Sequence, residues 1–556
     1  MQTRLNNRCA GLRAPQGTLI RGQAAAAVVP CSRPARRVQI VARAADANLH
    51  SGNSSQSFDE QHDSSSSSTS SSSSGKCPFL AALPAPPPAQ NAWWRRLQQL
   101  FSPADYQKEA LGPHSMVSAP AQMMMPPQYV LGTADMVKTA FAGEAEGLTT
   151  VAPSGLMSSR SLLGDQSLLM LPEPQHKYLR NLIMPAFTNE AIERLVPRME
   201  AVLQRYLDAW ADAGAPVKAH NELRHMTFEF IVAVVLGRDY PEATISRLSG
   251  LYTTWAGGLL AWPFIDLPWT PFGKAVAAKQ QLLDFFQAAV DEARLQLAAG
   301  HAVPGILGSL VSAVDEQGNR LTDAQLGDNL LLIMLAGHDT SSTTLTNVMA
   351  DLQSNPRVVE RLRQEQQAVV AKHGSRITGA ILKEMTYADA VIRETLRLHN
   401  VVSGLMRQAA KDFELGGYSG VVRQAAKDFE LGGYSVPKGT VLYLPVTHVG
   451  LQDPRFLEQH PEAYAPERFM TPEGQKPGAQ MPFGHGPRFC AGYAVAMAEM
   501  KVFLALLARG YDFDADTNTQ WRQEIGRVPA NGLPMTVSRR PAAVVAGAAP
   551  AAAARR

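Results

Sequence analysis

The chain has 556 residues, enough for one large domain or a few ordinary ones, and 45% of them are hydrophobic, as in typical globular proteins. Its formal charge of +3 is unevenly spread, because residues 1–43 hold eight arginines and no acid; subtracting these eight leaves −5 for the remainder. The charge therefore indicates no nucleic-acid partner, and the lack of a run of about 20 apolar residues argues against a membrane-spanning helix.

Residues 1–43 are typical of an organelle transit peptide. They are rich in arginine and alanine, contain no acid, and lack the central apolar run of a secretory signal. The stretch Val41–Ala45 (VARAA) resembles a plastid cleavage site of green algae and plants, with the cut after Arg43. We expect delivery to the chloroplast. The alternatives are delivery to the mitochondrion and a basic tail without a targeting signal.

The next segment, residues 44–89, is polar and ends in prolines. Residues 64–74 are almost all serine, and such a tract buries too little apolar surface to offset the entropy lost on ordering. We expect a disordered linker here, followed by one folded domain over residues 90–540 that opens with a helix at the Trp93–Trp94 pair. The Ala-rich residues 541–556 are expected to form a disordered tail.

Helical periodicity dominates the expected domain. The helical runs cover residues 176–186, 190–213, 222–236, 274–299 and 357–372. Strand-like segments are sparse and short, at residues 128–131, 440–444 and 534–538. This pattern predicts a mainly α domain with a minor β-sheet.

One predicted helix is unusually long. A capping box of Thr322 and Gln325 marks its start, and Pro356 stops it after Asn355, which gives about 33 residues or roughly 50 Å. Residues 330–336 in its first half are apolar on all sides, so we expect this helix to run through a core.

Residues 403–434 contain an internal repeat. Residues 403–418 and 419–434 agree at fourteen of sixteen positions and differ only at the third and fourth. Because a solenoid needs at least about three repeats to bury a face, two copies do not predict one. We interpret the pair as a local tandem duplication, either genuine or introduced by an error in the gene model.

Cys490 is the single cysteine expected in the folded domain. Cys9 and Cys31 belong to the leader and Cys77 sits beside the linker, so a disulfide framework is excluded. Cys490 ends a glycine-rich loop and precedes a predicted helix, whose free N–H groups would stabilise a thiolate. Arg488 would add positive charge near the N-terminus of this helix. The alternative is an inert buried cysteine.

This loop resembles the heme-binding signature of the cytochrome P450 family. Its spacing F-x-x-G-x-R-x-C-x-G runs from Phe483 to Gly492. Three further motifs occur in the family's order: AGHDT at residues 336–340, E-x-x-R at residues 394–397 and PERF at residues 466–469. The resemblance covers residues 90–540. It implies the P450 fold, with a long central helix over a heme b (iron protoporphyrin IX) whose iron is bound by Cys490.

The resemblance also implies roles for residues around that heme. Asp339 and Thr340 would supply a proton path for oxygen activation, and a hydrogen bond from the Thr340 hydroxyl to the carbonyl four residues earlier would open the helix locally. A buried structural ion network would consist of Glu394, Arg397 and Arg468. The residues that would bind the heme itself are His176, Arg180, Arg407, Arg423, Phe483, Arg488 and Gly492.

Two of these heme-site assignments carry alternatives. Arg407 and Arg423 occupy equivalent positions of the repeat; only one of them can bind a heme carboxylate, and we favour Arg407. His176 and Arg180 lie one helical turn apart and would face the heme together. A solvent-facing helix is the alternative for either residue.

Residues 267–274 and 482–503 are similar to the P450 branch that contains cyanobacterial and animal retinoic-acid hydroxylases. That similarity implies a monooxygenase acting on a long apolar, isoprenoid, retinoid or sterol-like substrate. We expect a monomer that receives electrons from another protein, ferredoxin in a plastid and otherwise a reductase. The candidates for the substrate pocket, each equally compatible with a core position, are Leu332, Leu335, Ala336, Val401, Val402 and Leu533.

Two other functions are compatible with the sequence. An isomerase or dehydratase of the same fold works without an electron donor, but such enzymes tend to lose the acid–threonine pair or to lengthen the cysteine loop, and both are intact here. A non-catalytic heme protein, disabled by the internal duplication, is the other alternative.

Overall fold

The computed structural model describes most of the chain between residues 85 and 541. The described residues are 85–87, 111, 115–119, 128–151, 158–261, 265–410, 413–415, 434–436, 438–457, 460–478, 480–524 and 526–541. All of them belong to one unit that spans Ser73–Arg556. The leader, most of the linker, the helix expected at Trp93, the Ala-rich tail and Arg423 lie outside the described residues.

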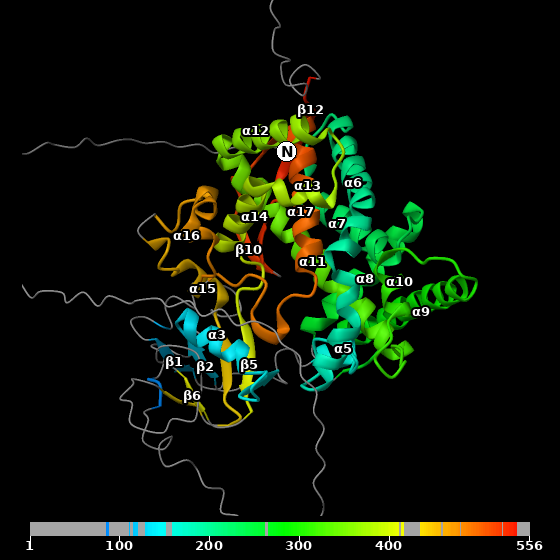
Figure 1. Cartoon of the computed structure of the whole chain (residues 1–556), viewed down its shortest axis with the longest axis vertical. Coiled ribbons are helices and arrows are strands. Elements are labelled where there is room, and N and C mark those ends of the chain that lie inside the picture. Colours follow the sequence, from blue (N-terminus) through cyan, green and yellow to red (C-terminus); the bar gives the residue numbers. More distant parts are fainter. Residues whose placement is uncertain are drawn as a thin grey trace, which may run out of the picture. The chain divides into compact units, whose positions relative to one another are not determined.

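Helices dominate the described residues, which confirms the predicted fold class (Figure 1). The bounds of the α-helices are α3 Ala134–Ala142, α4 Ser159–Leu163, α5 Gln175–Ile183, α6 Asn189–Asp212, α7 Ala219–Leu236, α8 Glu242–Gly257, α9 Pro271–Ala298, α10 Gly305–Ser312, α11 Asp323–Ser354, α12 Pro356–His373, α13 Gly379–Glu384, α14 Thr386–Leu398, α15 Val446–Leu451, α16 Pro472–Gln475 and α17 Tyr493–Gly510. The five predicted helical runs correspond to α5, α6, α7, α9 and α12, with ends that agree to within three residues.

The long helix α11 has the predicted start and end. The Thr322 hydroxyl accepts a hydrogen bond from the N–H of Gln325, whose side chain accepts one from the N–H of Thr322. α12 begins at Pro356, directly after Asn355 ends α11. α11 packs along α7, and Leu330, Leu331 and Met334 in its first half are buried in the main core.

The strands form one larger sheet and three small ones among the described residues. The larger sheet has the order β1 (Met116–Ala119), β2 (Gln128–Leu131), β8 (Val441–Leu444), β5 (Leu405–Ala409) and β3 (Thr149–Val151). β2 and β8 are parallel, and the other neighbours are antiparallel. The small sheets are β4 (Val217–Lys218) with β12 (Pro534–Arg539) and β9 (Tyr511–Ala515); β10 (Trp521–Glu524) with β11 (Gly526–Pro529); and β6 (Phe413–Leu415) with β7 (Tyr434–Val436).

The β6–β7 sheet joins the first copy of the internal repeat to the end of the second copy and the residues that follow it. β6 comes from the first copy, whereas β7 begins at the last residue of the second. Phe413 pairs with Val436, and Leu415 pairs with Tyr434. Because both copies read FELGGY, the residues that precede β7 directly in the sequence repeat those of β6.

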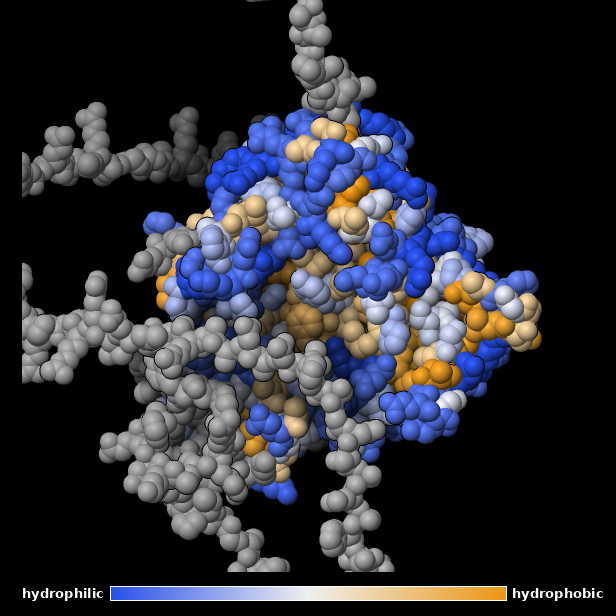
Figure 2. Space-filling model, viewed as in Figure 1, coloured by the Kyte–Doolittle hydropathy of each residue, from blue (hydrophilic) through white to orange (hydrophobic). Residues whose placement is uncertain are grey.

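The described surface has a recess whose base is apolar. In the view of Figure 1, hydrophobic residues are visible at the bottom of a hollow in the region of α11, between hydrophilic rims (Figure 2). Within the described ranges, no helix combines the length and the apolar character needed to cross a membrane.

Candidate functional site

Cys490 closes a tight loop directly before α17. Gly484 and Gly486 have φ angles of 75° and 68°, a left-handed conformation that favours glycine over residues with a Cβ. The N–H of Cys490 donates a 2.9 Å hydrogen bond to the carbonyl of Phe483, which fixes the loop. Gly492 caps the helix without a side-chain bond, so the thiol lies beside the free N–H groups of the first turn.

The surroundings of the Cys490 thiol act on its pKa in opposite directions. Burial raises this pKa, whereas hydrogen bonds from the backbone of Gly492 and Tyr493 and the positive charge of Arg180 lower it. The cation that acts on the thiol is thus Arg180; Arg488, which we expected there, turns toward Glu144 instead. The net effect is a raised pKa of the free thiol, and a metal ion bound to the sulfur would favour the thiolate.

Three arginines from distant parts of the sequence meet beside this loop. Arg180 on α5 donates a 2.7 Å hydrogen bond to the carbonyl of Phe489, next to Cys490. Arg407 lies on β5, and its pKa is lowered by burial and also by Arg488. Arg488 in turn donates to carbonyl groups of the segment before α5, namely those of Leu168, Leu169 and Leu171.

Glu144 is the buried acid of this cluster, and the sequence analysis missed it. Its carboxylate binds the Nε of Arg488 at 2.6 Å and lies 3.7 Å from the Nε of Arg407, with only 1% of the side chain exposed. No motif surrounds Glu144, and its partners follow far along the chain, so the sequence carries no signal for the contact.

His176 is a buried residue, which excludes the solvent-facing alternative for it. It is 2% exposed, and its Nδ1 lies 2.8 Å from the carboxylate of Glu173. Burial and the nearby Arg488 lower its pKa, against the influence of Glu173. His176 is therefore held neutral at the edge of the arginine cluster.

The residues of this region fit heme b. Arg407 and Arg488 contact one buried acid, Glu144, and Arg180 lies beside the cysteine loop, so these three cations and one acid leave a surplus of two positive charges for the two carboxylates of the porphyrin. The Nε of Arg407 has no hydrogen-bond partner among the described residues, although it is buried. Cys490 supplies the one thiol that an iron ligand requires.

The neighbours Asp339 and Thr340 on α11 point to different surroundings. The Thr340 hydroxyl donates to the carbonyl of Ala336 at 2.5 Å, the contact that we predicted, and α11 stays α-helical through this turn. Ala336 is exposed although it lies in the middle of a core helix. This face of α11 therefore borders an open space, as a binding site requires.

Asp339 instead faces α7 and α8. Its carboxylate forms a 2.9 Å ion pair with Arg224 and accepts a hydrogen bond from the Tyr252 hydroxyl, and Asp339 is 4% exposed. Burial, followed by the charge of Asp339, raises the pKa of Tyr252 well above its usual value, so that hydroxyl stays protonated. In this arrangement, the two partners hold the carboxylate away from Thr340.

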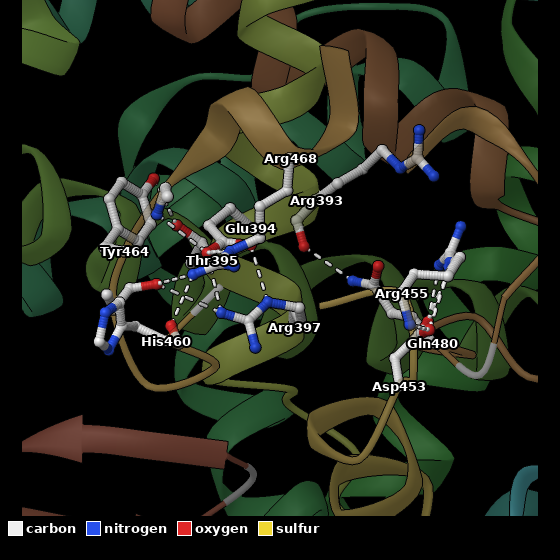
Figure 3. A network of polar contacts seen from close by, with 12 residues as sticks. Arg393, Glu394, Thr395, Arg397, Asp453, Arg455, His460, Tyr464, Arg468 and Gln480 are labelled. Carbon is white, nitrogen blue, oxygen red and sulfur yellow. Dashed lines mark hydrogen bonds and ion pairs between the residues drawn. The ribbon is translucent and has the colours of Figure 1, made fainter. Parts of the chain in front are cut away.

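Glu394, Arg397 and Arg468 form the expected ion network (Figure 3). Arg397 binds the carboxylate of Glu394 through two hydrogen bonds of 2.8 Å, and the Nε of Arg468 lies 3.2 Å from it. The N–H of Ala465 also donates to Glu394. At no more than 3% exposure, these charges depend on one another, because a buried charge left alone is strongly destabilising.

The candidate pocket residues divide into two groups. Leu332, Leu335 and Val402 are half-buried and Ala336 is exposed, whereas Val401 is buried. Leu533 is fully buried in the main core, with a φ of 54° and its carbonyl bonded to the N–H of Ala219 at the start of α7. This favours the core alternative for Leu533.

Gly526 at the tip of the β10–β11 hairpin was not predicted, although it borders Val401. Its φ is 87°, and a Cβ there would lie 2.8 Å from the Thr343 side chain and 3.1 Å from Val401. A single glycine between two short strands gives no sequence signal for this close approach.

Comparisons with known proteins agree with this geometry. The family model described as Cytochrome P450 matches residues 89–420 and 418–533, two pieces that meet inside the duplication. Cytochrome P450 26B1 of Rattus norvegicus is 27% identical over 411 residues, which cover 72% of this chain and 76% of that protein. Abscisic acid 8'-hydroxylase 1 of Arabidopsis thaliana is 28% identical over 397 residues, or 70% of this chain and 77% of that protein.

A solved structure is similar over most of the chain. Retinoic acid-bound cyanobacterial CYP120A1 superimposes with a TM-score of 0.69 at 25% sequence identity, covering 83% of this chain and 100% of that one. The similarity therefore extends to the whole of that folded domain.

Proposed function

Because the chain belongs to the cytochrome P450 family, we propose that it hydroxylates a long apolar isoprenoid substrate, with electrons from an external donor protein. Membership of the family makes the protein a cytochrome P450 monooxygenase that binds heme b. The proposed part is the substrate class and the identity of the donor.

Within the site, each of the chain's own residues has a defined task. When bound, heme b supplies dioxygen activation at its iron, and a thiolate ligand favours O–O cleavage by donating electron density. Cys490 would hold that iron, and the arginine cluster would hold the porphyrin carboxylates. The Thr340 hydroxyl donates to the Ala336 carbonyl at the exposed face of α11, so its oxygen would accept a hydrogen bond and orient a proton donor there.

The observation that carries the heme assignment is Cys490, the one thiol in the described part of the chain, directly before α17 and beside the arginine cluster. The reduced protein, expressed from Lys76, should therefore show the red-shifted CO-difference band of a thiolate-ligated heme. Cys490→Ala should abolish the band, whereas Cys77→Ala should keep it as the matched control. A band that survives Cys490→Ala would refute the ligand assignment.

Two observations support the isoprenoid substrate. Retinoic acid and abscisic acid, which the names of two similar proteins specify, are both isoprenoid carboxylic acids. Ala336 is an exposed apolar residue of α11, and Gly526 packs against Val401 and against Thr343 of the same helix. Turnover of all-trans-retinoic acid should require both O₂ and a reductant. Conversion without a reductant would favour the isomerase alternative, and a bound heme without turnover of any isoprenoid would favour a non-catalytic protein.

The location and the donor are proposed from the first 43 residues. Their arginines and their lack of acids support delivery to the chloroplast, where ferredoxin would supply the electrons to a monomeric enzyme. Residues 1–43 fused to a fluorescent protein should enter chloroplasts, and plastid ferredoxin should support turnover of the purified enzyme. Import into mitochondria instead would contradict this proposal.

A further inference from the structure

Glu144 lies in a tight turn between α3 and β3. The N–H of Gly143 caps α3 by bonding to the Thr139 carbonyl at 2.8 Å, and the N–H of Leu148 bonds back to the Gly143 carbonyl at 2.7 Å. A Cβ on Gly143 would lie only 2.9 Å from the Thr139 carbonyl oxygen, so the turn has little room to change. Glu144 is thus fixed in position by its backbone.

Two neighbouring elements bring arginines to this turn. The cysteine loop packs closely on the end of α3: a Cβ on Gly486 would lie only 2.8 Å from the carbonyl oxygen of Phe141. This packing places Arg488 beside Glu144. β3 pairs with β5 in a register that sets Val151 opposite Arg407. The same carboxylate therefore meets one arginine from the cysteine loop and one from the sheet.

The carboxylate is needed because both guanidinium groups are buried. The side chains of Arg407 and Arg488 are each 8% exposed, and they repel one another. Removing one partner of a buried ion pair leaves an uncompensated charge, which is strongly destabilising. Glu144 offsets this repulsion in part only, since its Oε2 and the Nε of Arg407 lack hydrogen-bond partners within the described chain.

We propose that Glu144 is a positioning residue of the heme site, which holds Arg407 and Arg488 in place for the heme carboxylates and lowers the reduction potential of the bound heme. The carboxylate orients the two donors before the heme enters, in the way that outer partners orient metal ligands. Its buried negative charge makes the addition of an electron to the heme less favourable.

The test compares Glu144→Gln and Glu144→Asp with the matched control Glu146→Gln, an exposed acid two residues away in the same turn. The measurements are the midpoint potential of the ferric/ferrous couple and the rate of heme transfer to apomyoglobin, with the CO-difference band as a check on Cys490. Glu144→Gln should raise the potential and speed heme loss about tenfold. Glu144→Asp should keep the potential near that of the wild type but also lose heme faster, and Glu146→Gln should change neither.

An unchanged potential in Glu144→Gln holoenzyme with an intact thiolate band would overturn the proposal, and so would a wild-type rate of heme loss. If Glu144→Gln does not accumulate as holoenzyme, Glu144→Asp decides the question. Faster heme loss than in Glu146→Gln then supports the positioning role, and an equal rate overturns it.

Discussion

Ser341 on α11 donates a 2.7 Å hydrogen bond to the carboxyl group of Glu499 on α17, and so joins the helix of Thr340 to the helix that follows Cys490. Glu499 is 1% exposed, and its Oε1 has no hydrogen-bond partner among the described residues. Burial raises the pKa of Glu499 to about 8, although the bond from Ser341 acts in the opposite direction. The carboxyl group is therefore largely neutral in the folded protein at pH 7.

Glu499→Gln should make the protein less sensitive to alkaline pH. Because the folded-state pKa of about 8 lies above the usual 4.5, the stabilising contribution of the neutral carboxyl is complete below pH 4.5 and is lost as the pH rises through 8. Glutamine keeps the shape and an oxygen that accepts from Ser341, but it does not ionise. Thermal unfolding midpoints measured across this range should fall more steeply in the wild type. Parallel curves for wild type, Glu499→Gln and the exposed control Glu473→Gln would contradict the expectation.

Asp339→Asn should lower turnover without weakening substrate binding. We expect kcat to fall by about 100-fold, a typical share for general acid–base catalysis, because asparagine cannot relay a proton to the site. Asparagine can still accept from Arg224 through its one oxygen and can donate to the Tyr252 hydroxyl through its NH2 group, so the packing of α7 and α8 on α11 should persist. Turnover with a purified donor and spectral titration with substrate separate the two effects. An equal loss of binding and turnover would mean that Asp339 is structural.

The sequence predicted the elements of this fold better than their contacts. Apolar periodicity located α6 and α12 to within one residue at each end, and the capping box of Thr322 and Gln325 located the start of α11. These signals are local, since each depends on residues within a few turns of one helix. For the same reason, the heme-binding loop before α17 was recognisable from its glycines and Cys490.

The contacts that escaped prediction depend on tertiary packing. Glu144 meets its arginines only because the cysteine loop packs on α3 and β3 pairs with β5. Glu499 looks like a surface acid in the sequence, although the apolar character of α17 on all sides is a sign that the helix is buried. Leu533 was a pocket candidate because an apolar residue near the chain's end fits a pocket or a core equally well.

Deleting residues 416–431 should leave the described sheet intact. The deletion removes sixteen residues, which is one repeat length, and joins Leu415 to Gly432. Leu415 pairs with Tyr434 in the structure, so Gly432–Gly433 would form a two-residue turn that keeps this register. Gly-Gly pairs suit such turns because both positions need positive φ. We expect an unchanged or higher unfolding midpoint and an intact CO-difference band.

Arg407→Ala and Arg423→Ala in the full-length chain separate the two copies, because deleting either one leaves a chain that is the same at all but two positions. Arg407→Ala should weaken heme retention, and Arg423→Ala should not. If Arg423→Ala loses heme while Arg407→Ala keeps it, the second copy provides the heme-site strand and our preference for Arg407 is wrong.

His399→Ala should loosen the β10–β11 hairpin and weaken binding of long apolar ligands. His399 is the residue directly after α14. Its ring lies 3.2 Å from the Asp351 carboxylate on α11 and 3.0 Å from the guanidinium of Arg527 on β11. Arg527 also stacks on the ring of Trp521, 3.8 Å from its centroid, so this contact orients both strands of the hairpin. Losing these part-buried polar contacts should cost about 1 kcal/mol of unfolding free energy.

The consequence for the site follows from Gly526, which packs against Thr343 and Val401 at the tip of that hairpin. Spectral titration of the holoenzyme with 1-dodecylimidazole and with imidazole distinguishes an effect on the pocket wall from an effect on the heme. Both ligands bind at the heme, but imidazole is too small to contact the pocket wall. His399→Ala should weaken the dodecyl compound selectively. The exposed control His373→Ala, which loses only a contact with Glu384, should leave both affinities unchanged. Equal weakening of both ligands by His399→Ala would place the effect on the heme and not on the hairpin.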